Sequence, residues 1–519
     1  MREKKDWFKV KGYLHLDKKL SRERRNKIEK YISNSKNIAS HAFLPLIYKT
    51  VSQRRYKVVD YTSDGKAIRR HKTKKGTQTK STKKERPIHF ASHIDAQIYS
   101  YYANEILLPA FEQKILNEPG LSDCISAYRK VPKENNKGNK CNIDFAADAF
   151  NEIKKRKNCI AIAVDITSFF STLDHKILKK RWAEVIDQSH LPNDHFNVFK
   201  SITKFRYINL KDFHYNKKGF DERKLSELRN KGIQALIESP NELKRLIKNK
   251  EIRVRKNQFH NKKKELIGIP QGLPISAILA NIYMYQFDKL ALKELIKKRN
   301  IFYRRYSDDI VIVCQEKEKE YVLDFLRDNL QGENIKLGMA KEKTEIALFK
   351  EEVIAGNRRQ QVYRMTHDGK LKFNVPFLYL GFEFYGYQCL IKSKNVATFY
   401  RNMKQVIRKK SRRADSQIES LINDKKIIYK TSLYRQFTHK GKTPRDLNRK
   451  RSEFKQDDLR NWRYDTQEIK REYRGNIFRY IHKAADILDA PEIHKQYRNH
   501  WKILRSTIKK YGFDNFKDQ

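Results

Sequence analysis

Residues Ile301 to Cys314 read IFYRRYSDDIVIVC. Two runs of β-branched and aromatic residues flank Ser307-Asp308-Asp309, a pattern that predicts a β-hairpin with a tight acidic turn. The apolar run after the turn favours burial. Adjacent carboxylates beside a buried strand are costly unless a cation meets them. The two aspartates are therefore either ordinary turn residues on a surface hairpin or part of a metal site.

A third carboxylate at the end of another strand favours the metal site. Residues Ile160 to Val164 form a continuous apolar run, typical of a buried central strand, and the run ends at Asp165. Asp165, Asp308 and Asp309, with Ile166 beside them, are the oxygen ligands expected for two Mg²⁺ ions, with Mn²⁺ as an alternative. One ion would lower the pKa of an attacking 3′-hydroxyl, and the other would hold the triphosphate and the leaving pyrophosphate. The three aspartates are thus predicted to be catalytic and metal-binding in phosphoryl transfer.

Tyr306-Ser307-Asp308-Asp309 resembles the Tyr-x-Asp-Asp box of reverse transcriptases. Other segments between residues 86 and 386 resemble further blocks of that family and follow in the same order. The resemblance implies an α+β right-hand polymerase, with fingers, an antiparallel palm sheet, a helical thumb and a basic helical C-terminal region. It also implies RNA-directed DNA polymerase activity, which is a nucleotidyltransferase reaction.

The resemblance implies four nucleotide-binding residues. Arg86 matches a basic residue over the incoming triphosphate, where a guanidinium can donate two hydrogen bonds to phosphate, although a surface arginine on a strand fits the same position. Phe170, five residues after Asp165, matches the residue under the sugar that excludes a 2′-hydroxyl and so implies deoxynucleotide use; core packing is the alternative. Gln271, in a Pro-Gln-Gly block, would hydrogen-bond near the nucleotide or template base. Tyr306 of the acidic box completes this group.

Four further residues are assigned by the resemblance alone. Lys343 matches a lysine that helps to protonate pyrophosphate as a general acid, although a solvated charge run fits equally. Arg129 would touch template or nucleotide, in a block where Ala127 replaces the usual glycine. Tyr379 and Gly381 match the primer-grip hairpin, in which a glycine lets the backbone approach the primer strand.

The blocks and the shifts in composition divide the chain into six regions. We expect helices near residues 95–111, with Asp95 as the cap, and near residues 276–288 and 320–330. A Lys/Thr/Gly-rich run at residues 66–84 predicts a loop or a fingers hairpin. The regions are a basic extension or fingers (1–85), fingers (86–158), first palm part (159–193), basic insertion with two helices and a hairpin (194–264), second palm part with the primer-grip hairpin (265–390), and helical thumb with C-terminal domain (391–519).

The composition predicts a polyanionic partner. The chain has 114 Lys and Arg residues against 61 Asp and Glu, a net charge of +53, and such an excess favours binding to phosphates. An anionic membrane surface is the competing interpretation, which the lack of a long apolar run or signal peptide weakens. Five scattered cysteines without a Cys/His cluster argue against zinc and disulfides, and favour a reducing cytoplasm.

The resemblance narrows the expected class of reverse transcriptase. No Cys/His endonuclease pattern, retron-type Val-Thr-Gly, RNase H acidic set or protease is found, whereas HIDAQIYSYYANEIL (93–107) and SAYRK (126–130) resemble bacterial defence-associated enzymes. We therefore expect an enzyme of antiphage defence. Its expected partners are dNTPs, a DNA primer or product and an RNA template, with a dedicated noncoding RNA as one candidate, and a second copy or a neighbouring defence protein. Alternatives are a retron-like or group II intron-like enzyme, or a catalytically silent nucleic-acid scaffold.

Overall fold

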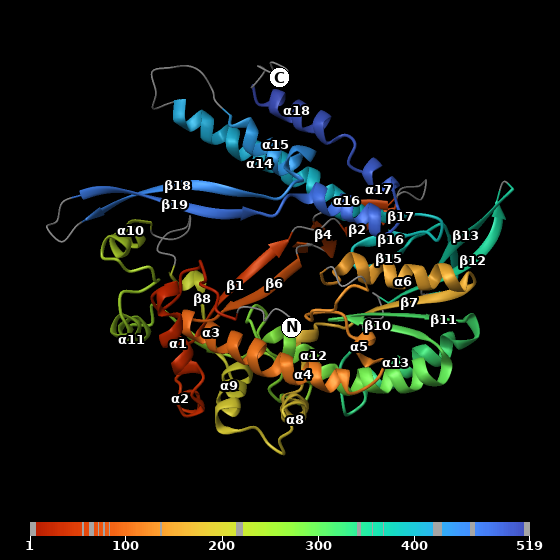
Figure 1. Ribbon diagram of the computed structural model, residues 1–519, viewed down its shortest axis with the longest axis horizontal. Coiled ribbons are helices and arrows are strands. Elements are labelled where there is room, and N and C mark those ends of the chain that lie inside the picture. Colours follow the sequence, from red (N-terminus) through yellow and green to blue (C-terminus); the bar gives the residue numbers. More distant parts are fainter. Residues whose placement is uncertain are drawn as a thin grey trace. The chain divides into compact units, whose positions relative to one another are not determined.

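The computed structural model describes residues 7–53, 57–61, 67–70, 72–75, 78–81, 84–134, 138–213, 222–339, 344–354, 356–366, 368–418, 428–456 and 462–512. Within residues 53–81 and 446–472, and at residues 222 and 415–418, it describes only the backbone. Figure 1 labels helices and strands that are named below. The chain divides into two compact units. The first contains residues 1–129, 165–310 and 320–342, and the second contains residues 130–164, 311–319 and 343–519.

The first unit is rich in helices and carries the acidic box. Its helical elements are η1 (Arg22–Arg24), α1 (Arg25–Ile32), α2 (Ser35–Ala39), α3 (His93–Tyr101), η2 (Tyr102–Leu107), α4 (Leu108–Leu116), α5 (Leu121–Cys124), α7 (Phe169–Thr172), α8 (His175–Val185), α9 (Asn193–Thr203), η3 (Leu210–Phe213), α10 (Glu222–Asn230), α11 (Pro240–Lys248), α12 (Ser276–Ala291) and η4 (Leu292–Lys297). Its strands are β1 (Leu46–Gln53), β2 (Lys57–Tyr61), β3 (Ala67–Arg70), β4 (Lys72–Lys75), β5 (Gln78–Ser81), β6 (Lys84–Phe90), β8 (Arg206–Asn209), β9 (Val254–Lys256) and β10 (Phe302–Tyr306). In the run at residues 66–84, for which a loop or a fingers hairpin was predicted, β4 and β5 pair antiparallel, and β3 pairs with β2, which precedes the run.

Helix α12 forms the centre of the first unit. Twelve of its 16 residues are buried, so the helix is apolar on nearly all sides, as expected of a core helix. It packs against α8, and the hydroxyl of Tyr283 donates to the carbonyl of Ile335 at 2.5 Å. At the start of α8, the carboxylate of Asp174 accepts hydrogen bonds from two main-chain N–H groups and caps the helix. The core beneath the acidic box is therefore built mainly from helices.

The basic insertion extends a sheet of the first unit. Strands follow the order β6-β1-β8-β9, in which β1 and β8 are parallel and the other neighbours are antiparallel. The two helices predicted for residues 194–264 are present as α10 and α11. In place of the predicted hairpin, β8 and β9 lie before and after these helices in sequence and pair antiparallel, and β8 also pairs with β1. Apolar residues of this segment share a core with the N-terminal segment. That core contains Leu16, Ile47, Ile208, Phe213, Leu236, Ile237, Leu246 and Ile252.

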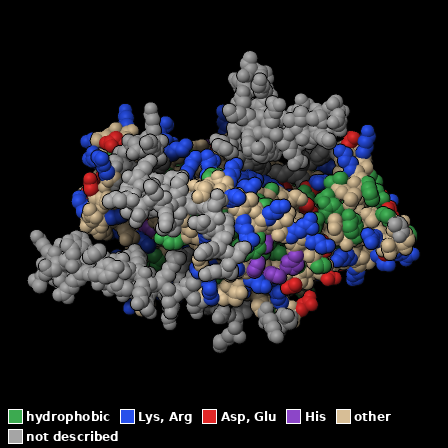
Figure 2. Space-filling view, turned by 90° about the horizontal axis from the view of Figure 1, so that it is seen from above, with side chains coloured by type: hydrophobic (Ala, Val, Ile, Leu, Met, Phe, Trp, Pro, Cys, Tyr) green, Lys and Arg blue, Asp and Glu red, His purple; other side chains and the backbone are tan. Residues whose placement is uncertain are grey.

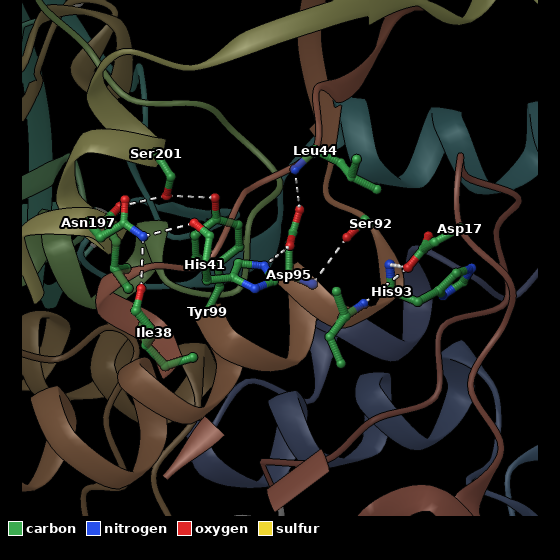
Figure 3. A network of polar contacts seen from close by, with 12 residues as sticks. Asp17, Ile38, His41, Leu44, Ser92, His93, Asp95, Tyr99, Asn197 and Ser201 are labelled. Atoms are coloured by element: carbon green, nitrogen blue, oxygen red, sulfur yellow. Dashed lines mark hydrogen bonds and ion pairs between the residues drawn. The ribbon is translucent and has the colours of Figure 1, made fainter. Parts of the chain in front are cut away.

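A buried polar network connects the first helices of the first unit (Figure 3). The carboxylate of Asp95 lies 2.8 Å from Nε2 of His41 and accepts the main-chain N–H of Leu44 at 3.0 Å. The side chain of Ser92, not that of Asp95, caps α3 by accepting the N–H of Asp95. The prediction that Asp95 is the cap is wrong, because this carboxylate instead pairs with a residue 54 positions earlier in the chain.

The second unit combines antiparallel strands with helices. Its elements are α6 (Asn142–Arg156), η5 (Glu316–Glu318), β12 (Glu345–Ile354), β13 (Asn357–Met365), β14 (Leu371–Phe373), β15 (Phe377–Tyr379), β16 (Phe382–Phe384), β17 (Cys389–Ile391), α14 (Ser393–Ile418), α15 (Lys430–Phe437), η7 (His439–Gly441), β18 (Arg445–Gln456), β19 (Trp462–Tyr473), α16 (Ile477–Ile487), α17 (Glu492–Lys495) and α18 (His500–Lys510). Three elements have residues in both units: β7 (Cys159–Asp165), β11 (Asp309–Cys314) and α13 (Lys319–Gln331). One sheet has the strand order β10-β11-β7-β12-β13-β14, and β7, β12, β13 and β14 pair antiparallel.

The C-terminal region was predicted to be helical, but it also contains two long strands. Between α15 and α16 the chain forms a long antiparallel pair, β18 with β19, over twelve residues of each strand. The segment has so many charged residues that its sequence shows no clear alternation of apolar and polar positions, which is the usual sign of a strand. The remaining elements of the region, α14 to α18, are helices as predicted.

The described surface is strongly basic. Figure 2 shows Lys and Arg side chains spread over the described part of one face, with fewer Asp and Glu side chains between them. All five cysteines are free thiols, and four of them are buried. Among the described helices, none has the length and apolar character needed to cross a membrane.

Candidate active site

The acidic box forms the predicted hairpin turn. Strand β10 ends at Tyr306, and β11 begins at Asp309. Ser307 lies in the left-handed region with a φ of 61° and is only 4% exposed. This conformation is uncommon for a non-glycine residue and is found in tight turns. The side chains of Asp308 and Asp309 are half-buried, next to the fully buried strand that follows them.

The third aspartate lies beside this turn. Asp165 ends β7, and the next residue, Ile166, donates its main-chain N–H to the carbonyl of Asp308 at 3.2 Å. Ile166 also bridges to Met339, so the main chain after β7 is held on both sides. Asp165 is half-buried like the other two aspartates. The structure therefore brings together two acidic positions that are 143 residues apart in sequence, and both lie in the first unit.

The three aspartates suit a divalent cation in their chemistry. Carboxylates are the hard oxygen ligands that Mg²⁺ and Mn²⁺ take in proteins, and partial exposure leaves room for phosphate oxygens. Asp165, Asp308 and Asp309, with the main chain of Ile166, would hold such ions. Among the described residues, no group of three or more His, Cys, Asp or Glu side chains is already placed to hold a metal ion, so the two-metal arrangement stays a prediction.

A buried ion pair between Arg305 and Asp288 is hydrogen-bonded to the main chain of the acidic turn. Arg305 and Asp288 are both 0% exposed, and the guanidinium donates to the carboxylate through Nε at 2.9 Å and Nη2 at 2.7 Å. The hydroxyl of Tyr303 donates to the same carboxylate at 2.8 Å. Nη1 of Arg305 donates to the carbonyl of Ser307 at 3.0 Å and to Oδ1 of Asn281 at 3.1 Å. One guanidinium thus connects the core helix α12 to the acidic turn.

The negative charge of Asp288 keeps Arg305 protonated although the guanidinium is buried. Burial by itself lowers the pKa of Arg305, but the charge and hydrogen bonds of Asp288 outweigh burial and raise this pKa above its ordinary value. Burial, followed by the charge of Asp288, raises the pKa of Tyr303 well above its ordinary value. Arg305 therefore stays cationic and Tyr303 stays a neutral hydrogen-bond donor. Arg305 was not selected from the sequence, where it follows Arg304 in the strand before the acidic box and nothing nearby indicates its buried partner.

Main-chain hydrogen bonds link the segments that carry Phe170 and Gln271. The N–H of Ile269 donates to the carbonyl of Phe170 at 2.8 Å, and the N–H of His89 donates to the carbonyl of Gln271 at 2.8 Å. Phe169 is buried, whereas Phe170 is only partly buried, with the two ring centroids 5.5 Å apart. Core packing therefore explains Phe169 but leaves part of the Phe170 ring accessible.

Arg86 lies on the strand that contacts the Pro-Gln-Gly segment. It is an exposed residue of β6, opposite Val51 of β1, and precedes His89 by three residues. Gly272, next to Gln271, has a φ of +110°, and a Cβ added there would lie 2.6 Å from the carbonyl oxygen of His89. A glycine is needed at this position because both the backbone angle and the close approach exclude a side chain. Arg86 and Gln271, which were predicted to contact the triphosphate and the base, therefore lie on neighbouring segments.

The geometry of Arg129 favours a structural role over the predicted contact with template or nucleotide. Its side chain is only 2% exposed, and Nε and Nη2 donate to the two carboxylate oxygens of Glu112 at 2.7 and 2.8 Å. Nη1 donates to the carbonyls of Ser122 and Ile125. The preceding residue, Tyr128, is exposed at the acidic turn, and the sequence analysis did not select it.

The predicted primer-grip residues lie in the second unit. Tyr379 ends β15 and pairs with Phe382 of β16, so that Leu380 and Gly381 form a two-residue turn, with φ values of 43° and 96°. Positive φ at both positions is typical of the turns that suit the twist of a hairpin. The side chain of Tyr379 is buried. Lys343, the predicted general acid, lies outside the described residues.

Comparison with known proteins identifies the family of the chain. The profile of the family described as "Reverse transcriptase (RNA-dependent DNA polymerase)" matches residues 73–384, which is 312 of 519 residues. A search of curated proteins finds no match.

Solved structures with a similar arrangement include two fungal telomerases. Telomerase of Candida tropicalis, truncated from its C-terminal domain, has a TM-score of 0.34 and 11% identity over 72% of this chain and 61% of its own. Telomerase of Candida albicans, in complex with a TWJ fragment of telomeric RNA, has a TM-score of 0.36 and 11% identity over 95% of this chain and 67% of its own. The chain thus spans 61% and 67% of the length of these two telomerase chains. On the family match, the chain belongs to the reverse transcriptases and has the α+β right-hand polymerase fold.

Proposed function

We propose that this reverse transcriptase adds deoxynucleotides to a DNA 3′ end by two-metal phosphoryl transfer at Asp165, Asp308 and Asp309. The observation that carries the proposal is the 3.2 Å hydrogen bond from the N–H of Ile166 to the carbonyl of Asp308, because it puts the strand end with Asp165 beside the acidic turn. Bound Mg²⁺ or Mn²⁺ would activate the attacking hydroxyl and neutralise the charge of the leaving pyrophosphate. The buried Arg305 fixes the main chain of the turn, so the carboxylates need little reorganisation to bind the ions.

Four further residues of the first unit would place the nucleotide. Arg86 is exposed and can donate two hydrogen bonds to the triphosphate. The accessible part of the Phe170 ring would lie under the sugar and leave no room for a 2′-hydroxyl. Gln271 lies in a segment whose main chain is fixed by His89, which suits a contact with the base. In the same proposal, Tyr306 contacts the nucleotide from the strand before the turn.

The test is single substitution of the acidic residues. Asp165→Asn and Asp308→Asn are each expected to lower dNTP incorporation on an RNA template by at least about 10³-fold, because asparagine keeps the shape but removes the charge that binds the ions. Asp328→Asn is the matched control, since Asp328 is an exposed aspartate of α13 in the same unit. Incorporation within tenfold of wild type by both site variants, folded like the control, would overturn the assignment. Variants that bind RNA while the wild type incorporates no nucleotide would favour a nucleic-acid scaffold.

We further propose a biological setting for this polymerase. The stretches 93–107 and 126–130 resemble defence-associated bacterial enzymes, and the net charge of +53 suits a long RNA partner such as a dedicated noncoding RNA. Five free thiols suit a reducing cytoplasm. A homo-oligomer or a neighbouring defence protein is part of the same proposal.

Sequencing the nucleic acid that copurifies with the wild type and with Asp308→Ala tests this setting. A defined RNA in both samples, with complementary DNA only in the wild type, would support templated synthesis on that RNA. Branched RNA–DNA molecules would support a retron-like enzyme instead. Phage plating on bacteria that carry either form measures the defence role: equal plaque numbers on both would contradict it. The mass of the purified particle gives the oligomeric state.

A further inference from the structure

Tyr128 has an unusual conformation next to the acidic turn. It is an aromatic residue in the left-handed region, with a φ of 64°, and its side chain is 46% exposed. Bulky residues rarely adopt this conformation, because the Cβ approaches the main chain too closely. Backbone strain of this kind persists only where the surroundings impose it, and it gathers at functional sites.

The residues on both sides of Tyr128 are held in place. The carbonyl of Ala127 accepts a hydrogen bond from Nδ2 of Asn281 at 2.9 Å, and Ala127 is buried. On the other side, the guanidinium of Arg129 is buried and bound to Glu112. The main chain at Tyr128 therefore cannot relax without breaking one of these contacts, while the side chain itself remains accessible.

The hydroxyl of Tyr128 reaches the acidic box. It lies 3.1 Å from Oγ of Ser307, the residue directly before Asp308. The carbonyl of Ser307 is held by Arg305, and Arg305 also donates to Oδ1 of Asn281. Asn281 thus binds both segments, since its amide donates to Ala127 and its oxygen accepts from Arg305.

The segment of Tyr128 runs along the strand that leads to the turn. Ile125 forms a parallel bridge with Arg305, and the N–H of Ser126 donates to the carbonyl of Arg305 at 2.9 Å. All of these residues belong to the first unit. The segment that carries Tyr128 is therefore hydrogen-bonded to β10, the strand that leads into the acidic turn.

We propose that Tyr128 is a further residue of the nucleotide-addition site: its ring contacts a nucleotide bound at the acidic turn, and its hydroxyl positions Ser307. The proposal rests on the assignment of Asp308 under the proposed function. An exposed tyrosine ring is a stacking surface for a base or sugar, and such contacts do not depend on base identity. The nucleotide is either the incoming dNTP or the 3′-terminal nucleotide of the primer, and separate measurements distinguish the two.

The hydroxyl is tested by a double-mutant cycle. Tyr128→Phe and Ser307→Ala each remove one partner of the hydrogen bond, and each is expected to lower kcat about 2- to 12-fold. The double variant is expected to lose no more than either single variant, because the two groups act through one contact. Tyr31→Phe is the matched control: Tyr31 is 37% exposed and its hydroxyl also bonds to one side chain, that of His41 at 3.0 Å. Independent, multiplying effects in the double variant would overturn the positioning role.

The ring is tested by Tyr128→Gly and Tyr128→Trp. Glycine accepts a φ of 64°, so the glycine variant is expected to fold with a thermal midpoint no lower than that of the wild type. Loss of a stacked ring is expected to weaken nucleotide binding about 5- to 150-fold, while tryptophan retains binding within about threefold. A rise in the KM for dNTP assigns the ring to the incoming nucleotide. A rise in the Kd for primer–template, with the KM for dNTP unchanged, assigns it to the primer end.

The controls separate this proposal from the underlying site assignment. If the glycine variant keeps the KM for dNTP, the Kd for primer–template and kcat within twofold of wild type, while Asp308→Asn is inactive, the proposal for Tyr128 is overturned and the site assignment stands. If Asp308→Asn remains active, the site assignment itself fails.

Discussion

Removing one partner of the buried pair between Arg305 and Asp288 should destabilise the first unit severely. Arg305→Met leaves the Asp288 carboxylate 0% exposed; among the described residues, the hydroxyl of Tyr303 is then the one side-chain donor left to it. Asp288→Asn leaves the guanidinium buried against a neutral amide. An uncompensated buried charge costs about 3–5 kcal/mol. We therefore expect each single variant to lower the free energy of unfolding by that amount.

The double variant Arg305→Met/Asp288→Asn should be more stable than either single variant. It buries no net charge, and the new asparagine can still accept from Tyr303. The double variant lacks the guanidinium that donates to the carbonyl of Ser307 and to Oδ1 of Asn281. Each buried polar group left without a partner costs about 1–3 kcal/mol. The two substitutions should therefore compensate each other by about 2 kcal/mol or more. The kcat should stay about 10- to 100-fold below wild type, because the carbonyl before Asp308 no longer has its donor.

Hydrogen exchange of the β10 peptide, residues 302–306, measures the effect in the unit concerned. A loss of 3–5 kcal/mol corresponds to about a 150- to 5,000-fold faster exchange of its protected amides. Primer extension on an RNA template gives kcat for the same samples. The reasoning is refuted if the single variants exchange within fivefold of wild type, or if the double variant exchanges as fast as the worse single variant.

Three shorter predictions follow from other contacts. Gly272→Ala should cost about 1–3 kcal/mol and raise the KM for dNTP, because its Cβ would meet the carbonyl of His89 at 2.6 Å at a φ of +110°; a thermal midpoint and KM equal to wild type would contradict this. Phe170→Val should lower the discrimination against ribonucleotides about 10- to 200-fold, as measured by the ratio of kcat/KM for dNTP and NTP, and an unchanged ratio would assign Phe170 to the core. Burial lowers the pKa of His89 from 6.5 to about 4, so the unfolded chain takes up a proton before the folded chain does. The free energy of unfolding should therefore fall by about 3 kcal/mol as the pH is lowered from 6.5 to 4. In His89→Gln, urea titrations should show a smaller dependence of the free energy of unfolding on pH; the same dependence as in the wild type would count against this role of His89.

Local patterns predicted much of the site. The apolar run before Asp165 and the alternating residues around Asp308 identified two strands and a turn, because strand formation and burial follow from side-chain type over a few residues. The family match confirms the right-hand polymerase fold that these blocks implied. The approach of Asp165 to Asp308 was inferred from their common chemistry, and the hydrogen bond from Ile166 supports it.

Partners far apart in sequence were harder to predict. Nothing near Arg305 in the sequence indicates that it pairs with Asp288, 17 residues earlier. Arg129 was expected at the nucleic acid, yet its guanidinium is buried against Glu112, also 17 residues earlier. In both cases a charged residue suggested exposure, whereas packing supplied the compensating charge that makes burial tolerable.

The acidic turn, the strand that ends at Asp165, the core helix α12 and the basic character of the chain could all be predicted from sequence, because each depends on residues close together or on composition. Packing was needed to reveal which buried charges meet, that β8 pairs with β1 while β9 pairs with β8, and that Tyr128 lies against Ser307. The physical reason is that burial of a polar or charged side chain is favourable only with a partner, and the packing of distant segments selects that partner.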